Sequence, residues 1–295
     1  MKSIILFGML TSYSAFCFGQ TGNTSKASMD SIIASHTDTA PIKSTLTVGA
    51  VYANNASYYG QKPEGNTSYI AIAASYKFKS GFYLSGMAYK LLNEKTSSVS
   101  ASSVAAGVNF KLAKKLSADL SYTHAFYPAY SPMLQAANAE NASVELAYEN
   151  WVHISLKGDY DFGKTNDEFV TAAISKSINL FSIGKKDVVT INPSADISAG
   201  TQRFYQTYLT EKKLRDSLLG IILNPITGNP SEGNSNTVSS TSFNVLSYNF
   251  KLPLAYNRCH YLVEAAYQLS VLSSKVQSDQ RKANSFVTLS FYYQF

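Results

Sequence analysis

The chain has 295 residues, of which 45% are hydrophobic, 15% are charged and 13% are aromatic, and its formal net charge is +6. So many aromatic side chains exclude a disordered chain, and because no run of roughly 18 apolar residues occurs, the sequence offers no membrane-spanning helix. Its two cysteines exclude a disulfide-dense scaffold and a cysteine-based zinc site. The low charge leaves two classes, a soluble β protein or a β-barrel that faces lipid.

The first residues have the pattern of a secretory signal peptide. A lysine precedes the short apolar run Ile4–Leu10, and Cys17 and Gly19 are small residues of the kind found just before a cleavage site. We therefore predict a signal peptide over 1–19. Residues 20–43 are polar and have no sustained period, so we predict a flexible periplasmic linker, with a plug of the lumen or a tether for a partner as alternatives.

From residue 44 to the last residue, apolar and polar side chains alternate. The final segment shows this best, because Leu289, Phe291, Tyr293 and Phe295 are each separated by one residue. A period of two sends the two sets to opposite faces of a β-strand. Only in 82–92 is the facing ambiguous. The twelve segments are 45–52, 70–78, 82–92, 103–112, 116–123, 143–149, 152–162, 168–180, 187–203, 240–252, 258–270 and 284–295.

The connections between these segments alternate in length. Long connections such as 56–66 and 205–239 alternate with short ones such as 79–81 and 113–115. If the first strand starts in the periplasm, every short turn is periplasmic and every long loop is extracellular, which is the asymmetry of transmembrane barrels. A soluble β-sandwich, the main alternative, has no reason to sort its loops in this way.

The chain therefore resembles the outer-membrane β-barrel proteins of diderm bacteria, of the twelve-stranded type. These proteins typically end in a strand of alternating aromatic residues with a terminal Phe, which Phe291, Tyr293 and Phe295 match. The resemblance covers 44–295 and implies an all-β, up-and-down antiparallel transmembrane barrel in the bacterial outer membrane, with both termini in the periplasm. It also implies contact with outer-membrane lipid, and recognition of the terminal strand by the barrel-insertion machinery.

The 205–239 connection departs most from a plain barrel. Leu214 and Leu218 have helical spacing and lie opposite charged residues such as Glu211 and Arg215. We therefore predict a short helix within this long extracellular loop. The helix either caps the rim of the barrel, or it folds into the pore as a constriction or contacts a membrane-protein partner.

Turning the polar face of each segment inward predicts a lumen of mixed charge. Basic and acidic side chains would then pair across a narrow channel, and they would not form a filter of a single sign. No run of inward aromatic residues is evident from the pattern. The candidate lumen-lining residues are Lys77, Lys111, Asp119, Glu145, His153, Lys157, Asp159, Asp196, Lys251, Arg258 and Glu264.

Some twelve-stranded outer-membrane barrels are phospholipases, and the chain resembles them in one His-x-Ser pair, His153 and Ser155. In that chemistry the serine is the nucleophile and the histidine is the base. However, Leu156 stands where an Asn usually follows, and the pair lies on the polar face, away from lipid. We therefore predict no enzyme. Because the four histidines are scattered and no single basic face is seen, we also predict no metal, no cofactor and no nucleic-acid binding.

Taken together, these patterns predict an integral outer-membrane barrel. The first hypothesis for its function is a narrow channel for small polar solutes, partly closed by 205–239. The alternative is a non-conducting structural or accessory subunit of an outer-membrane assembly, and a lipid hydrolase is the third. The mixed charges of the predicted lumen do not name a solute.

Overall fold

The computed structural model describes residues 43–62, 67–93, 98–128, 138–163, 166–201, 243–274 and 283–295. The predicted signal peptide, the predicted linker apart from Lys43, and the predicted loop helix lie outside the described residues. No helix among the described residues is long and apolar enough to cross a membrane.

One sheet of fourteen strands contains β1 (Thr45–Ala53), β2 (Tyr69–Lys77), β3 (Phe82–Leu91), β4 (Ala101–Ala113), β5 (Leu116–Phe126), β6 (Glu140–Glu149), β7 (His153–Phe162), β8 (Asn166–Ser175), β9 (Ile178–Phe181), β10 (Asp187–Ile191), β11 (Ser194–Thr201), β12 (Phe243–Arg258), β13 (Tyr261–Leu272) and β14 (Ala283–Gln294).

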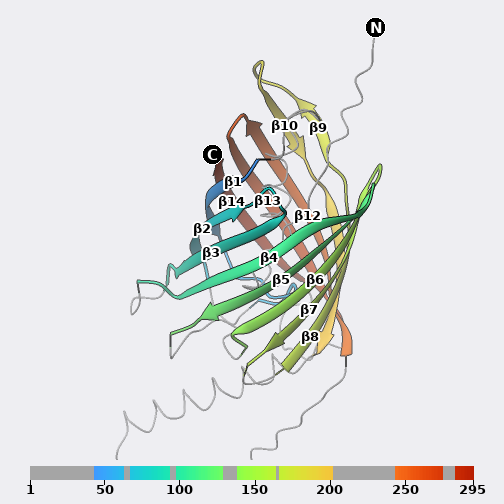
Figure 1. The fold of residues 1–295 in the computed structure, drawn as a ribbon. Coiled ribbons are helices and arrows are strands. Elements are labelled where there is room, and N and C mark those ends of the chain that lie inside the picture. The colour runs from blue at the N-terminus through green and yellow to red at the C-terminus, as the bar shows by residue number, and fades with distance from the viewer. Residues whose placement is uncertain are drawn as a thin grey trace, which may run out of the picture.

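Twelve of these strands close into a barrel (Figure 1). Consecutive strands pair from β1 to β8, and β1 also pairs with the last strand, β14. Strand β11 completes the ring because it pairs with both β8 and β12. Closure satisfies the backbone of every barrel strand, which matters in a bilayer because lipid offers no hydrogen-bond partners. The twelve-stranded, up-and-down antiparallel barrel predicted from the sequence is therefore confirmed.

Two of the predicted strands are each divided in two. Segment 168–180 forms β8 and β9, and segment 187–203 is divided at Pro193 into β10 and β11. Proline has no N–H to donate to a sheet, and the carbonyl of Pro193 accepts a hydrogen bond from the N–H of Lys176 at 3.1 Å. Beyond this break the chain continues as the β9–β10 hairpin, in which β10 pairs with the last residues of β12.

The two ends of the barrel differ. The tight turns, the start of β1 and the C-terminal Phe295 lie at one end, which we call the short-turn end; the opposite end is the long-loop end. The β9–β10 hairpin projects beyond the other turns at the short-turn end (Figure 1). Asp187 holds the tip of this hairpin, because its Oδ1 accepts hydrogen bonds from the N–H groups of Ile183 and Gly184, both at 2.8 Å.

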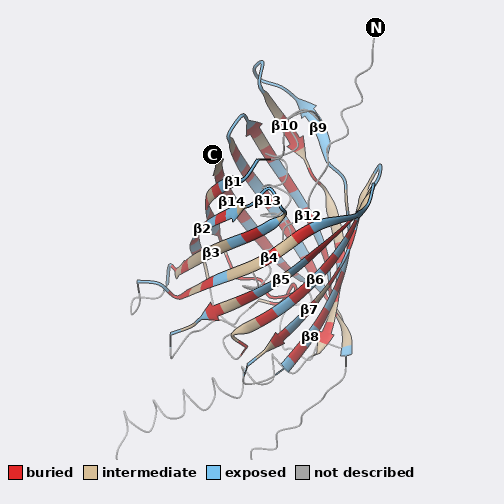
Figure 2. Ribbon diagram, viewed as in Figure 1, coloured by how far each residue is buried: buried red, intermediate tan, exposed pale blue. Residues whose placement is uncertain are grey.

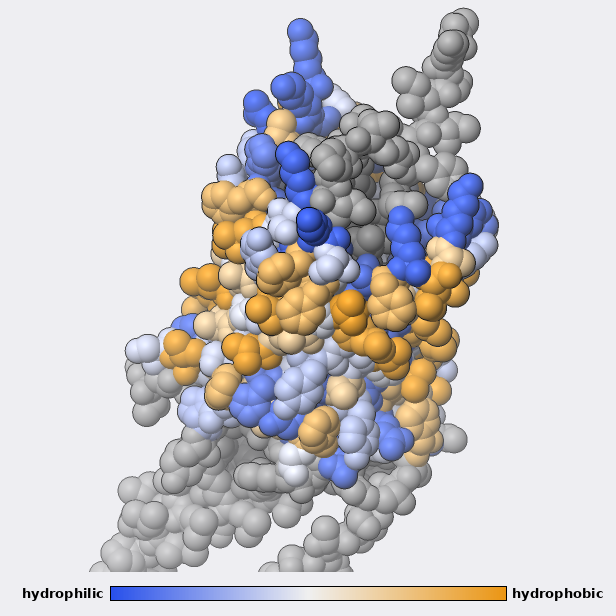
Figure 3. Space-filling model, viewed as in Figure 1, coloured by the Kyte–Doolittle hydropathy of each residue, from blue (hydrophilic) through white to orange (hydrophobic). Residues whose placement is uncertain are grey.

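Burial alternates along the barrel strands, with polar side chains inside and apolar side chains outside (Figure 2). The acidic residues Asp119 and Glu264 are each 1% exposed, whereas the apolar residue Ile72 is 65% exposed. In Figure 3 the apolar residues gather across the middle of the visible face, and hydrophilic residues lie at the turns above. A soluble β-sandwich buries its apolar faces, so this inverse distribution argues against it and is typical of a barrel that faces lipid.

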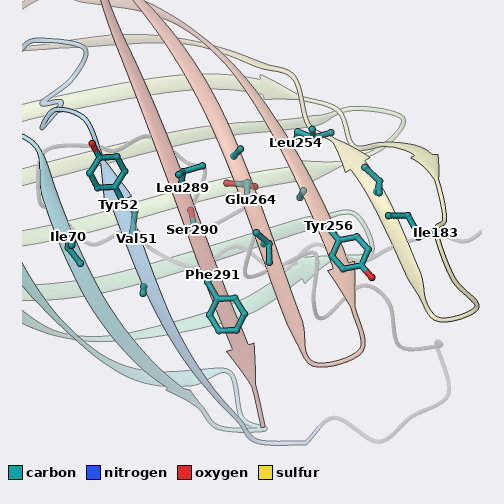
Figure 4. Close-up of a pocket in the computed structure, with 15 residues that line it drawn as sticks. Val51, Tyr52, Ile70, Ile183, Leu254, Tyr256, Glu264, Leu289, Ser290 and Phe291 are labelled. Atoms are coloured by element: carbon teal, nitrogen blue, oxygen red, sulfur yellow. The ribbon is translucent and has the colours of Figure 1, made fainter.

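A shallow apolar hollow interrupts the outer wall over β1, β2, β12, β13 and β14 (Figure 4). It forms where the small side chains of Ala50 and Ala265 stand among larger ones such as Tyr52 and Leu254. Glu264 also lines this stretch of wall, but its side chain is buried on the inward face. The hollow therefore belongs to the lipid-facing surface.

Aromatic rings also enter the interior, which the sequence pattern did not predict. Tyr83 and Tyr89 are buried on the inward face, and this settles the facing of the ambiguous segment 82–92. Three buried rings lie over glycines directly opposite on the neighbouring strand, where a Cβ would come within 2.3 or 2.4 Å of a ring atom. These pairs are Tyr83 with Gly107, Phe169 with Gly200, and Tyr292 with Gly49. The missing side chain of each glycine lets a ring lie flat against the wall.

Candidate functional site

The connection between β1 and β2 folds into the barrel from the long-loop end. At the tip of this segment, residues 54–62, which we call the inner loop, Tyr58 and Tyr59 are 4% and 3% exposed. Two backbone hydrogen bonds between Tyr58 and Gln61, both 2.9 Å long, close the tip as a two-residue turn. The alternation of loop lengths predicted an ordinary extracellular loop over 56–66, and the inward fold corrects that prediction.

Both tyrosines at the tip contact the barrel wall. The Tyr58 hydroxyl donates to Asp161 Oδ2 at 2.7 Å, and the Tyr59 hydroxyl donates to Asp159 Oδ2 at 3.2 Å. The Tyr59 ring also stacks on Phe169 of β8, with ring centroids 3.9 Å apart. A hydrogen bond to a charged acceptor contributes about 1.5–3 kcal/mol. The tip is therefore fixed to β7 and β8, on the side of the barrel opposite β1.

The backbone of this tip is strained and closely fitted. Tyr59 has φ 48° and Gly60 has φ 79°, the left-handed pair of a type I′ turn, which costs a non-glycine residue about 1–2 kcal/mol. Ser247 Oγ donates to the Tyr59 carbonyl at 2.8 Å, and Asn284 Nδ2 donates to the Gly60 carbonyl at 3.0 Å. A Cβ on Gly60 would lie 2.7 Å from both Ser247 Oγ and Asn249 Oδ1. The inner loop thus also contacts β12 and β14, and it crosses the interior.

A charged row lies on the wall beside the inner loop. Asp119 on β5, Glu145 on β6 and Lys157 on β7 are directly opposite one another in the register of the sheet. All three are 5% exposed or less. Lys157 Nζ also lies 2.8 Å from Asp159 Oδ1, the residue that anchors Tyr59. The row therefore connects directly to the contacts that hold the inner loop.

The other candidate lining residues occupy different depths of the barrel. Asp196 and Lys251 form a second buried ion pair, with Lys251 Nζ 2.9 Å from Asp196 Oδ1, and Glu264 is buried on the inward face. Lys77 is half-buried at the short-turn end, where Lys111 is exposed. Asp196, Lys251 and Glu264 are therefore buried in the interior, whereas Lys77 and Lys111 lie at its rim.

Arg258 is placed differently from the prediction. It ends β12, where it is exposed on the same face as Tyr256, and Asn257 is the buried inward residue. The prediction counted Arg258 as the start of the next strand and continued that strand's alternation through the turn. Asn257 Nδ2 donates to Thr190 Oγ1 at 3.3 Å, which confirms its inward position.

The His153 and Ser155 pair does not have the arrangement of a base and a nucleophile. Nδ1 of His153, which is half-buried at the short-turn end, contacts Glu149 Oε1, and Ser155 is buried on the inward face. Within the part of the chain that the structure describes, no hydrogen bond joins His153 to Ser155. The serine is also separated from membrane lipid by the barrel wall, so the pair gives no support to lipid hydrolysis.

No protein-family model matches the sequence, and no curated protein matches it. Solved structures similar to it include a KdgM porin, with a TM-score of 0.47 and 10% identity over 84% of this chain and 99% of that one. Another is the COG4313 outer membrane channel from Pseudomonas putida F1, with a TM-score of 0.44 and 12% identity over 87% of this chain and 97% of that one. LpxR from Salmonella typhimurium is a third, with a TM-score of 0.43 and 7% identity over 84% of this chain and 99% of that one. These similarities concern the fold alone, and the closed sheet with its inverted burial decides the class. The chain is a transmembrane β-barrel.

Sequence reasoning missed the inner loop of this barrel. Its partners on β7 and β12 lie about 100 and 188 residues away along the chain, so no local pattern connects them. The available signal was the Tyr58-Tyr59-Gly60 sequence, since adjacent aromatic residues are unusual in a solvated loop and glycine permits a tight turn.

Proposed function

We propose that this outer-membrane barrel is a narrow channel for small polar solutes. The observation that carries the proposal is a polar interior that is crossed by one inward loop. A twelve-stranded barrel is wider than the eight-stranded barrels that side chains fill, and polar groups along its wall can replace part of the hydration of a passing solute. In the proposed orientation the short-turn end and both termini are periplasmic. A constriction by 205–239 stays a prediction, because that segment lies outside the described residues.

The inner loop sets the width of the proposed path. Tyr58 and Tyr59 bring two rings and two hydroxyl groups into the interior, where Asp161 and Asp159 hold them against the wall. Removal of these two rings would widen the path without changing the closed sheet. Conductance should therefore depend on these two tyrosines more than on residues of the outer wall.

Single-channel recording of the purified full chain in planar bilayers tests this function. Discrete current steps are expected for the native protein, and larger steps for a Tyr58→Ala, Tyr59→Ala double variant. Tyr52→Ala is the matched control, because Tyr52 is a 38% exposed tyrosine on the outer face of β1, and its steps should equal those of the native protein. If neither the native protein nor the double variant gives current, the channel proposal fails.

One observation favours a second candidate, a non-conducting accessory subunit. Charged residues of the interior such as Glu145 and Asp196 are 5% exposed, and the inner loop is tied to four strands. A barrel filled in this way could serve as a rigid scaffold for an outer-membrane assembly. Absence of current together with a stoichiometric partner that copurifies with the chain would favour it.

A further inference from the structure

The interior of the barrel has an excess of acidic side chains. Within the described residues, seven acidic side chains but two lysines are buried, all on the inward face, which gives a formal charge of −5. The half-buried Lys77 and Glu149 at the short-turn end offset one another, and the half-buried Lys62 of the inner loop adds one positive charge, so the balance stays negative. All the described residues together carry 14 basic and 11 acidic side chains, a formal charge of +3. Among the described residues, negative charge is therefore gathered inside and positive charge elsewhere.

Carboxylates face one another directly across neighbouring strands. Asp119 is opposite Glu145 in the pairing of β5 with β6, and Asp161 is opposite Asp167 in the pairing of β7 with β8. Each of these four residues is 5% exposed or less. Like charges directly opposite one another in a sheet are destabilising, and burial strengthens their repulsion because the local dielectric is low. A cation between or beside such carboxylates relieves that repulsion.

A buried amide oxygen adds to this acceptor surface. Asn141 is 4% exposed, and its Nδ2 donates to Asp161 Oδ1 and, at 3.5 Å, to Asp159 Oδ1. These two bonds fix the orientation of the amide and leave its Oδ1 as a further acceptor. Within the described part of the chain this buried oxygen has no hydrogen-bond partner. Carboxylate and amide oxygens are the ligands that hard cations prefer.

We propose that the interior selects for small cations and cationic solutes over anions. The proposal rests on the channel function proposed above and names the class of solute that the channel takes. A passage lined by one sign of charge, with low-dielectric walls, concentrates the potential along its axis, and acidic linings are the usual basis of cation selectivity. The inner loop contributes tyrosine hydroxyls at its tip and one lysine, Lys62, against seven carboxylates of the wall, so the wall sets the sign of the selectivity.

The reversal potential of the reconstituted full chain under a potassium chloride gradient measures this selectivity. We expect a permeability ratio of K⁺ to Cl⁻ of about 3 or more. Asp119→Asn combined with Glu145→Gln should bring the ratio toward 1. This pair leaves Asp161 and Asp159, which anchor Tyr58 and Tyr59, unchanged, so the size of the current steps should stay close to that of the native protein. The Tyr83 hydroxyl donates to Asp119 Oδ1 at 3.0 Å. In the variant, the amide oxygen of the new asparagine can accept the same hydrogen bond.

The matched control is Glu168→Gln, because Glu168 is an exposed acidic residue on the outer face of β8 and adjoins the buried Asp167 in sequence. Its ratio should equal that of the native protein. Current without preference, or with preference for Cl⁻, overturns the cation proposal and leaves the channel function standing. No current from the native protein overturns both. If the double variant fails to fold, the sign of the native reversal potential still decides.

Discussion

At the scale of single residues, the inner loop depends on an unfavourable backbone conformation. Tyr59 has a left-handed φ of 48°, which costs about 1–2 kcal/mol, and its stacking on Phe169 and its hydroxyl contact with Asp159 offset that cost. Strain of this kind persists only where the surroundings impose it. The balance is small, so single substitutions at the tip should release the loop from the wall.

Gly60→Ala is the first substitution that we expect to release it. The new Cβ would lie 2.7 Å from Ser247 Oγ and Asn249 Oδ1, and φ +79° is strained for alanine. The tip should move away from β12, and single-channel conductance should increase while the barrel still folds. Gly86→Ala is the control, because a Cβ there meets its nearest atom at 3.7 Å. Equal conductance in the two variants would show that the inner loop does not narrow the path.

At the scale of structural elements, the β9–β10 hairpin is the part of the sheet with least support. Strand β9 pairs with β10 alone, and the turn depends on Asp187, which accepts from two backbone N–H groups and from the Tyr256 hydroxyl at 3.1 Å. The N–H of Gly184 and these other donors hold the pKa of Asp187 below its ordinary value. The carboxylate therefore stays charged at neutral pH and keeps the turn closed.

Asp187→Ala should loosen this hairpin and leave the barrel intact. Without the carboxylate, the N–H groups of Ile183 and Gly184 lose their acceptor and the tip frays. Trypsin should then cut after Lys185 or Lys186, both exposed, several-fold faster than in the native protein. Asn179→Ala, an exposed change on the same hairpin, provides the comparison. An unchanged rate of cleavage in the Asp187 variant would contradict the role given to this carboxylate.

The strands themselves could be predicted from the sequence because a period of two is a local property. Leu289, Phe291 and their neighbours on β14 show their facing without reference to any other strand. The break at Pro193 was missed because the pattern was extended through a residue that supplies no ladder hydrogen bond. Arg258 was misplaced because a turn resets the alternation. The contacts of Tyr58 and Tyr59 were beyond reach, since they depend on which distant strands the closed barrel brings opposite β1.

At the scale of the whole molecule, the barrel has apolar side chains outside and polar side chains inside, the inverse of a soluble protein. Its stability should therefore depend on how deep in the bilayer each outward side chain lies. Leu289→Arg places a charge near the middle of β14, where Leu289 is 51% exposed, and should cost about 2–4 kcal/mol of unfolding free energy in lipid. Ser285→Arg, exposed near the long-loop end of the same strand, should cost roughly 0–1 kcal/mol. Urea titration in vesicles measures both. Equal costs would contradict the assignment of this face to lipid.

The orientation of the whole barrel in the membrane is open to a direct test. Cys259 is a free, exposed cysteine in the turn between β12 and β13, at the short-turn end. The other cysteine, Cys17, belongs to the predicted signal peptide, so the mature chain should carry a single thiol. If the short-turn end is periplasmic, a polyethylene-glycol maleimide too large to cross the outer membrane should not label intact cells. It should label them once that membrane is permeabilised.

A chain that carries Cys259→Ser and Leu92→Cys supplies the opposite case. Leu92 is 46% exposed beside the end of β3, at the long-loop end, so its thiol should react in intact cells. The two measurements together exclude a failure of the reagent, since each chain has one thiol and each end of the barrel is probed once. Labelling of Cys259 in intact cells, with Leu92→Cys protected, would place the short-turn end outside. The inner loop would then close the barrel from the periplasm, and the path would be narrowed from within the cell envelope.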